Sequence, residues 1–254
     1  MYLKRSIIAL FTVFGLSHGS LAHSSWWESG MDLLKDIQSE SPTSDSSVQP
    51  SNNLSSEELN KAFKEALSLG SKAVVSQLSV KDGFNADQAI HIPLPDELKR
   101  VKSLLGNVGM GNLMEDLELK LNRAAEAATP EAQALFLNAI KSMTFEDVQT
   151  IYQGPKDSGT QYLKSKTSDD LKQKMRPIIE QTLNSVGAVN TYDKVMHEYK
   201  SLPFVPDVKA DLLNHVTQKG MDGMFYYLAK EEEKIRKDPV KQTTELLKKV
   251  FGSE

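Results

Sequence analysis

The chain has 254 residues, of which 39% are hydrophobic and 25% are charged, and its formal net charge is −4 at pH 7. These values are ordinary for a folded protein and exclude collagen-like and wholly disordered chains. The sequence contains no cysteine, which excludes disulfide frameworks, cysteine-ligated zinc or iron–sulfur sites and cysteine nucleophiles. The weakly acidic balance offers no basic footprint, so we expect no nucleic-acid partner.

The first 22 residues have the layout of a secretory signal peptide. Lys4 and Arg5 precede an apolar stretch over residues 7–16, and the small residues Ser20 and Ala22 mark a cleavage site. The apolar stretch is too short for a membrane-spanning helix, which needs about 20 residues, so we expect no transmembrane span in the mature chain. Because an exported protein without cysteine needs no oxidative folding, the sequence predicts a bacterial periplasmic location.

Residues 23–37 form a short amphipathic segment that contains both tryptophans, Trp26 and Trp27. Residues 38–53 are rich in Ser, Pro, Asp and Asn and lack an apolar period, which predicts a flexible linker. Two interpretations of the tryptophan segment stay open. It docks back on the domain that follows, or Trp26 and Trp27 anchor the chain to a membrane surface or a partner.

From residue 54 to the end, nearly every segment has apolar residues at helical spacing. The pattern predicts an all-α fold, an antiparallel multi-helix bundle in a single domain over residues 54–254. In the first half we expect a helix over 55–78 with Ser55 as its cap, a turn at 81–87 and an extended packed segment at 89–95. Helices at 95–105 and up to about 128 follow, then one capped by Thr129, and another over 145–153 capped by Thr144.

In the second half the pattern predicts a helix near 159–165 and a separate one, capped by residues 167–170, that ends before Gly187. A shorter helix is expected over 189–199, followed by a turn marked by Pro203 and Pro206. The longest helix is expected over 208–237, and a final helix after Pro239.

The matches to familiar catalytic motifs in this sequence are misplaced or incomplete. Residues 15–19 match G-x-S-x-G but lie inside the predicted signal peptide, and His197 begins a zinc-protease pattern whose second histidine is replaced by Ser201. Asp82, Asn85 and Asp87 could offer oxygens to a cation, yet their spacing suits a plain turn better. We therefore assign no catalytic residue, no cofactor-binding residue and no metal ligand, and we expect no cofactor.

One helix carries a possible polar cluster made of Glu118, Asn122, Arg123 and Glu126, whose members are three or four residues apart. It could line a cavity, or it could form a solvated face or a structural ion pair. A second charged run spans residues 230–237, where acidic residues precede basic ones by four positions. We interpret that run as an exposed, charged helix end.

Several short stretches of the sequence together resemble those of a known family. They are residues 54–58 with 64–67, residues 82–84 with 92–95, residues 116–126, residues 143–147, residues 202–204, and residues 222–233. The chain is similar in these stretches to the exported bacterial family called domain of unknown function 4197, over about residues 54–252. The resemblance implies no established activity and no catalytic residue. Some relatives begin with a lipoprotein cysteine, which this sequence lacks, so lipid anchoring is not implied here.

The expected function is that of an exported, non-enzymatic binding or interaction module whose partner is a protein, a small molecule or a lipid. An alternative is an enzyme with an unrecognised carboxylate site in the helical core, built from the polar cluster. Another alternative is a protein that binds lipid or a membrane surface through Trp26, Trp27 and its apolar stripes.

Overall fold

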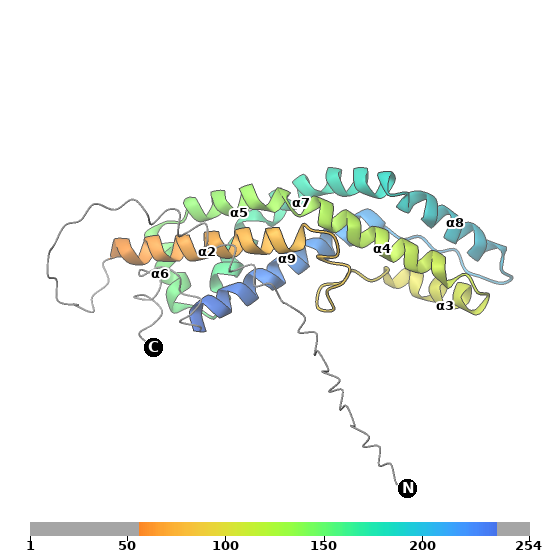
Figure 1. Cartoon of the computed structure of the whole chain (residues 1–254), viewed down its shortest axis with the longest axis horizontal. Coiled ribbons are helices and arrows are strands. Elements are labelled where there is room, and N and C mark those ends of the chain that lie inside the picture. The colour runs from red at the N-terminus through yellow and green to blue at the C-terminus, as the bar shows by residue number, and fades with distance from the viewer. Residues whose placement is uncertain (1–55, 238–254) are drawn as a thin grey trace, which may run out of the picture. The chain divides into compact units, whose positions relative to one another are not determined.

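The computed structural model describes residues 56–237, all of which belong to one unit of the chain (Figure 1). The predicted signal peptide, the tryptophan segment, the linker, the Ser55 cap and the helix after Pro239 lie outside these residues. The described part contains eight α-helices, one short 3-10 helix and no strand. The helices are α2 (Ser56–Leu78), α3 (Lys99–Asn107), α4 (Gly111–Ala128), α5 (Glu131–Lys141), α6 (Phe145–Gln153), α7 (Ser158–Ser185), α8 (Ala188–Ser201) and α9 (Leu212–Lys237), with the 3-10 helix η1 at Asp96–Leu98.

The two longest described helices, α7 and α9, pack against each other at the centre of the bundle. They are antiparallel, because Gly159 near the start of α7 meets Glu232 near the end of α9, and Met175 meets Gly220. Helices α2 and α5 pack against this pair toward one end, while α3, α4 and α8 pack together toward the other (Figure 1). The fold is therefore all-α with antiparallel packing, as the sequence predicts.

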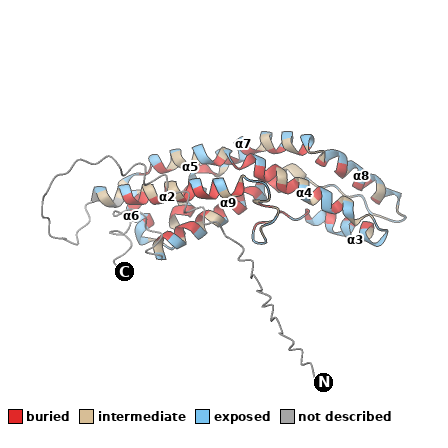
Figure 2. Cartoon of the chain, in the orientation of Figure 1, coloured by how far each residue is buried: buried red, intermediate tan, exposed pale blue. Residues whose placement is uncertain are grey.

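The apolar residues at helical spacing form one continuous core. The inner side of each helix is buried and the outer side is exposed (Figure 2). In α2 the buried residues include Ala62, Phe63 and Val74, and in α4 they include Met114 and Leu117. These positions confirm the predicted stripes, since side chains three and four residues apart share a helix face.

Between α2 and η1 the chain has no regular structure, yet it packs closely on the bundle. Ile90, Ile92 and Leu94 are buried while Pro93 between them is exposed. The predicted turn at 81–87 is confirmed. The predicted extended segment at 89–95 is confirmed only from residue 91 onward, because Ala89 and Ile90 lie in a turn that the N–H of His91 closes by donating to the carbonyl of Asp87 (2.8 Å). We name residues 82–92 the α2–α3 connection.

One predicted helix break and one predicted helix cap are wrong for the same physical reason. The expected break at residues 167–170 does not exist, and α7 runs continuously through it. The hydroxyl of Thr167 donates to the carbonyl of Leu163 (2.7 Å) and is buried. Thr129 likewise donates to the carbonyl of Ala125 (2.8 Å) instead of capping α5. A threonine hydroxyl can bond backward to the preceding turn as readily as forward to a free N–H.

The helix predicted over 208–237 begins only at Leu212. Asp211 accepts a hydrogen bond from the backbone N–H of Asn214 (2.9 Å), which caps the helix start. With 26 residues α9 is also shorter than α7, which has 28. The predicted stop at Gly187 is confirmed, since this residue has a φ of +73°, a conformation that glycine adopts without strain.

Candidate functional site

The four polar residues Glu118, Asn122, Arg123 and Glu126, here named the α4 cluster, lie on the side of α4 that faces the α2–α3 connection. Their spacing of three and four residues places them on one helix face. The structure brings all four together with residues of the connection, and each of them bonds at least one of its atoms. The residues of the cluster are partly or wholly buried.

Glu126 is only 4% exposed and accepts hydrogen bonds at both carboxylate oxygens. Its Oε1 atom accepts from the backbone N–H groups of Phe84 and Asn85, each at 3.1 Å. Its Oε2 atom accepts from Nη1 of Arg123 at 2.7 Å. A buried carboxylate is stable only with such partners, so Glu126 and the turn that it binds depend on each other.

Arg123 connects Glu126 to Asp82, whose Oδ1 atom lies 2.7 Å from Nη2 of the guanidinium. The hydrogen bond from Arg123 and a second one from Asn85 hold the pKa of the Asp82 carboxyl below its usual value. Asp82 has a φ of +69°, a conformation that short polar side chains tolerate better than others. The ion pair therefore fixes a turn that has an uncommon backbone geometry.

Asn122 is fully buried and binds both backbone groups of Ile92. Its Oδ1 atom accepts from the N–H of Ile92 (2.9 Å), and its Nδ2 atom donates to the carbonyl of the same residue (2.9 Å). The Nδ2 atom also donates to the carbonyl of Glu118 (2.9 Å). An extended segment without a partner strand thus has its buried backbone groups satisfied by one amide side chain.

Glu118 lies at the outer edge of the cluster, with a side chain that is 19% exposed. Its Oε1 atom lies 2.8 Å from Nε2 of His91, and its Oε2 atom accepts from Lys102 at 3.0 Å. Burial raises the pKa of Glu118, but the bonds from His91 and Lys102 outweigh it and the net pKa is lowered. His91 has its other ring nitrogen 2.9 Å from the carbonyl of Asn85. Both ring nitrogens of His91 therefore lie within hydrogen-bonding distance of an oxygen atom.

The α4 cluster thus forms a clamp that holds the α2–α3 connection on α4. The sequence left open whether this cluster lines a cavity or forms a solvated face or a structural ion pair. The geometry of the cluster matches a structural ion pair that is mostly buried. None of its four residues lines any of the grooves described below. Asp82 and Asn85 bond to each other, and Asp87 accepts from the hydroxyl of Tyr227 and the N–H of Ala89. The carboxylates of Asp82 and Asp87 therefore already accept hydrogen bonds from the protein, and the side chain of Asn85 is itself one of the donors to Asp82.

A second polar cluster, at the start of α7, is not what the sequence predicts. Glu232 and Arg236 pair as their spacing indicates (2.8 Å), but Glu232 is 6% exposed and the side chain of Arg236 is 14% exposed. The interpretation of residues 230–237 as an exposed helix end is wrong for this pair. Glu232 accepts hydrogen bonds from the backbone N–H groups of Gly159 and Thr160 (2.9 and 2.8 Å). These N–H groups lie in the first turn of α7 and therefore have no acceptor within the helix. Only Glu233 and Lys237 form the exposed pair expected there.

The connection between α8 and α9 contains an exposed aromatic residue that sequence reasoning missed. Phe204 is fully exposed and has a φ of +60°. That backbone conformation is strained for a bulky side chain and costs about 1–2 kcal/mol. The sequence signals at this loop were the turn predicted from Pro203 and Pro206 and the resemblance to the family at residues 202–204, and neither indicates an exposed ring. Strained residues gather at functional sites, so this loop is a second candidate site.

The hollows on the surface of residues 56–237 that we describe are open grooves. The largest has a volume of about 520 Å³, lies between α2 and α5 and is lined mainly by charged residues such as Lys61 and Lys64. A groove of about 280 Å³ lies where α7, α8 and the start of α9 meet. Within the described residues there is no group of three or more side chains that could hold a metal ion. The same residues include no helix long and apolar enough to cross a bilayer.

Comparison with known proteins gives one match. The family described as protein of unknown function (DUF4197) matches residues 53–252. No curated protein and no solved structure matches the chain.

Proposed function

Because the chain belongs to the DUF4197 family, whose description gives no activity to start from, we propose from its sequence and geometry that it is an exported binding or interaction protein of the periplasm, and not an enzyme. The single observation that favours a binding module over an enzyme is the state of the α4 cluster. Both oxygens of Glu118 and both oxygens of Glu126 already bind donors of the protein itself.

A catalytic acid or base must reach its substrate within about 2.6–3.2 Å. The carboxylates of the α4 cluster meet the protein's own donors at those distances, so a substrate would have to displace them and release the α2–α3 connection. The cluster is therefore better suited to holding the fold than to chemistry. The open grooves and the exposed ring of Phe204 instead favour contact with another molecule over its surface.

Export is supported by the sequence of residues 1–22, with Lys4 and Arg5 ahead of the apolar stretch and Ala22 at the cleavage position. Intact mass measurement of the protein recovered from the periplasm tests this directly. We expect a mature chain that begins at His23. A chain that keeps residues 1–22 and stays in the cytoplasm would contradict the proposal.

The binding role is tested by native mass spectrometry of the mature protein purified from its own periplasm. We expect a partner chain or ligand to be retained. Saturable turnover of a small substrate that is lost in the Glu118→Gln variant, with folding preserved, would overturn the proposal and favour an enzyme with a carboxylate site.

Lipid or membrane-surface binding is a second candidate, and the exposure of Phe204 is the observation that favours it. Flotation of the mature protein with liposomes, with and without residues 23–53, separates a role for Trp26 and Trp27 from a role for the described domain. Flotation that survives the deletion but fails in Phe204→Ala would assign lipid binding to the α8–α9 connection.

A further inference from the structure

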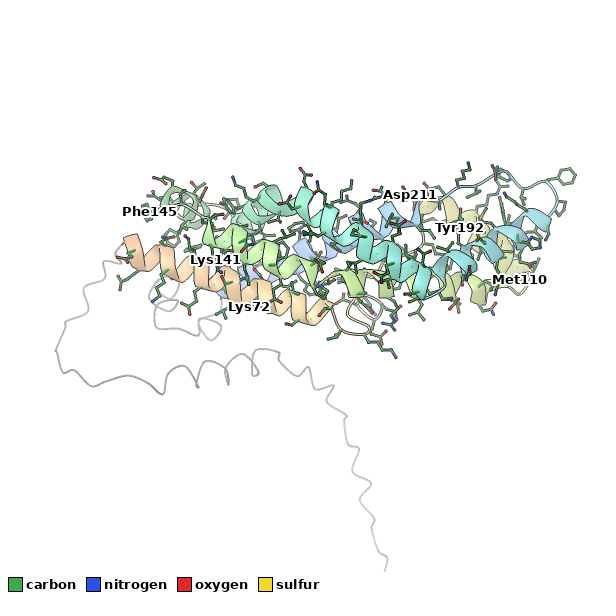
Figure 3. The ribbon with its side chains drawn as sticks, turned by 90° about the horizontal axis from the view of Figure 1, so that it is seen from above. Lys72, Met110, Lys141, Phe145, Tyr192 and Asp211 are labelled. Carbon is green, nitrogen blue, oxygen red and sulfur yellow. The ribbon has the colours of Figure 1, made fainter. Side chains whose placement is uncertain are left out.

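The largest of the grooves that we describe, here named the α2–α5 groove, has a volume of about 520 Å³. This volume lies within the range of about 300–1,000 Å³ that is usual for ligand sites. Helix α2 supplies lining residues from Glu57 to Ser68, and α5 supplies Ile140 and Lys141. Figure 3 shows the two helices side by side, with Lys141 next to α2 and Lys72 farther along α2.

One end of the α2–α5 groove is held in a fixed shape by Lys64. Its Nζ atom donates to the carbonyl of Met143 (2.7 Å) and to the carbonyl of Lys141 (3.3 Å). These bonds join α2 to the end of α5. Because the groove is formed before a ligand arrives, less entropy is lost when one binds.

Asn60, which lines the α2–α5 groove, carries an acceptor without a donor. Its Oδ1 atom is buried and accepts no hydrogen bond from any of the described residues. A buried acceptor without a donor is unfavourable, and native structures retain few of them. Since the last torsion of an asparagine side chain is broad, this amide turns toward a molecule in the groove at little cost.

The lysines at the edges of the groove are available to a ligand. Lys61 and Lys141 come from different helices, and neither forms an ion pair with a described residue. The charged side chains of the α4 cluster, by contrast, all have partners within the protein. Three lysines and two glutamates line the groove, so its net charge is positive and favours an acidic ligand.

Asn122 shows, in the same protein, how an asparagine amide binds an extended chain. It accepts from the N–H of Ile92 and donates to the carbonyl of the same residue. We propose that the α2–α5 groove binds an extended acidic peptide of another protein, with Asn60 bonded to the peptide backbone and Lys61 and Lys141 paired with its carboxylates.

The length of the groove agrees with such a peptide. Its lining on α2 runs from Glu57 to Ser68, which is about 16 Å at a rise of about 1.5 Å per residue. An extended chain rises about 3.3 Å per residue, so about five residues of the peptide lie in the groove. The inference rests on the proposed binding role, for which it names a site and a class of partner.

Selection of a phage-displayed library of random hexapeptides on the mature protein tests the proposal. We expect the enriched peptides to carry Asp or Glu. Lys61→Glu should weaken their binding by about tenfold or more, because it replaces an attraction with a repulsion. The matched control is Lys72→Glu, which makes the same change at an exposed position of α2 outside the groove. It should leave the affinity unchanged.

Asn60→Leu separates a role in binding from a role in folding. The substitution removes an acceptor that has no donor in the free protein, so we expect the free energy of unfolding to stay the same or to rise. The affinity for the selected peptides should fall by about fivefold, the usual effect of one lost hydrogen bond. Lower stability with unchanged affinity would assign Asn60 to the fold alone and contradict the proposal.

A selection that enriches no peptide overturns the proposal. Peptides that bind Lys61→Glu and Lys72→Glu equally well also overturn it, and enrichment of basic peptides contradicts the assigned partner. If Lys61→Glu retains the same partner as the wild type in native mass spectrometry, the proposed function stands and the groove is not its site.

Discussion

Replacing Glu126 with glutamine destabilises the protein, because Glu126 holds the α2–α3 connection on α4. Its carboxylate accepts from two backbone N–H groups at one oxygen and from Arg123 at the other. Glutamine has a single acceptor oxygen, and its amide group is a donor. In either orientation of the amide, a donor faces the Arg123 guanidinium or the N–H groups of Phe84 and Asn85.

The size of the effect follows from burial and from the partners that remain. Hydrogen bonds to a charged group contribute about 1.5–3 kcal/mol each, and removing one partner of a buried ion pair costs about 3–5 kcal/mol. The cost here is lower, since the side chain of Arg123 is 22% exposed and keeps its bond to Asp82. We expect a loss of about 2–3 kcal/mol in the free energy of unfolding, which lowers Tm by about 5–10 °C in a domain of this size.

The assay is urea unfolding of the mature chain, followed by far-UV circular dichroism. Glu115→Gln is the matched control, since Glu115 is exposed on the same helix, and it changes the free energy by less than about 0.5 kcal/mol. Amide hydrogen exchange at Phe84 and Asn85 should also become faster in Glu126→Gln. An unfolding free energy within about 0.5 kcal/mol of the wild type would refute the assignment of Glu126 as the anchor of this connection.

The remaining predictions concern packing, capping, pH and processing. Gly223→Ala destabilises the protein by about 1–3 kcal/mol, since a Cβ there would lie 2.8 Å from the ring of Phe84. Gly70→Ala stabilises it by up to about 1 kcal/mol, because the nearest neighbours of a Cβ there are 3.8 Å away. Thermal unfolding compares the two variants, and equal shifts in their Tm would contradict this prediction. Thr144→Ala removes the capping box at the start of α6 and costs about 1 kcal/mol by urea unfolding, and no loss would show that the cap is dispensable. The pKa of Asp82 is lowered in the folded state, so the contribution of Asp82 to stability is complete above the usual carboxyl pKa of 3.8 and is lost as pH falls through the lower folded value. The stability of Asp82→Asn should therefore approach that of the wild type as pH falls through that value. A constant difference across pH would be inconsistent with this ion pair.

Helix periodicity alone could predict the fold class, because the buried positions of each helix recur every three or four residues. The helix break predicted at 167–170 and the helix cap predicted at Thr129 were wrong because each depended on a single hydroxyl group. A threonine can cap a new helix or bond backward to the preceding turn, and the sequence around Thr129 and Thr167 does not distinguish these outcomes. In both residues the buried packing of the side chain favours the backward bond.

Spacing could also predict that the α4 cluster shares one face, but it could not predict its partners. Glu126 binds backbone N–H groups about 40 residues earlier in the chain. Such contacts are set by tertiary packing, for which one sequence carries no local signal. The burial of Glu232 could not be predicted for the same reason, since its partners are the first N–H groups of α7.

The exposure of Phe204 could not be predicted, because aromatic residues are usually buried. The two prolines that surround it could predict a turn but not the positive φ of Phe204 or the direction of its side chain. Such conflicts between a residue and its local environment tend to mark functional positions.

The measurement that tests the central proposal most directly is native mass spectrometry of the protein purified from the cells that make it. We predict a mature chain beginning at His23 that carries a non-covalently bound partner chain or ligand. A bare monomer that still contains residues 1–22 and retains nothing would contradict both the export and the binding role.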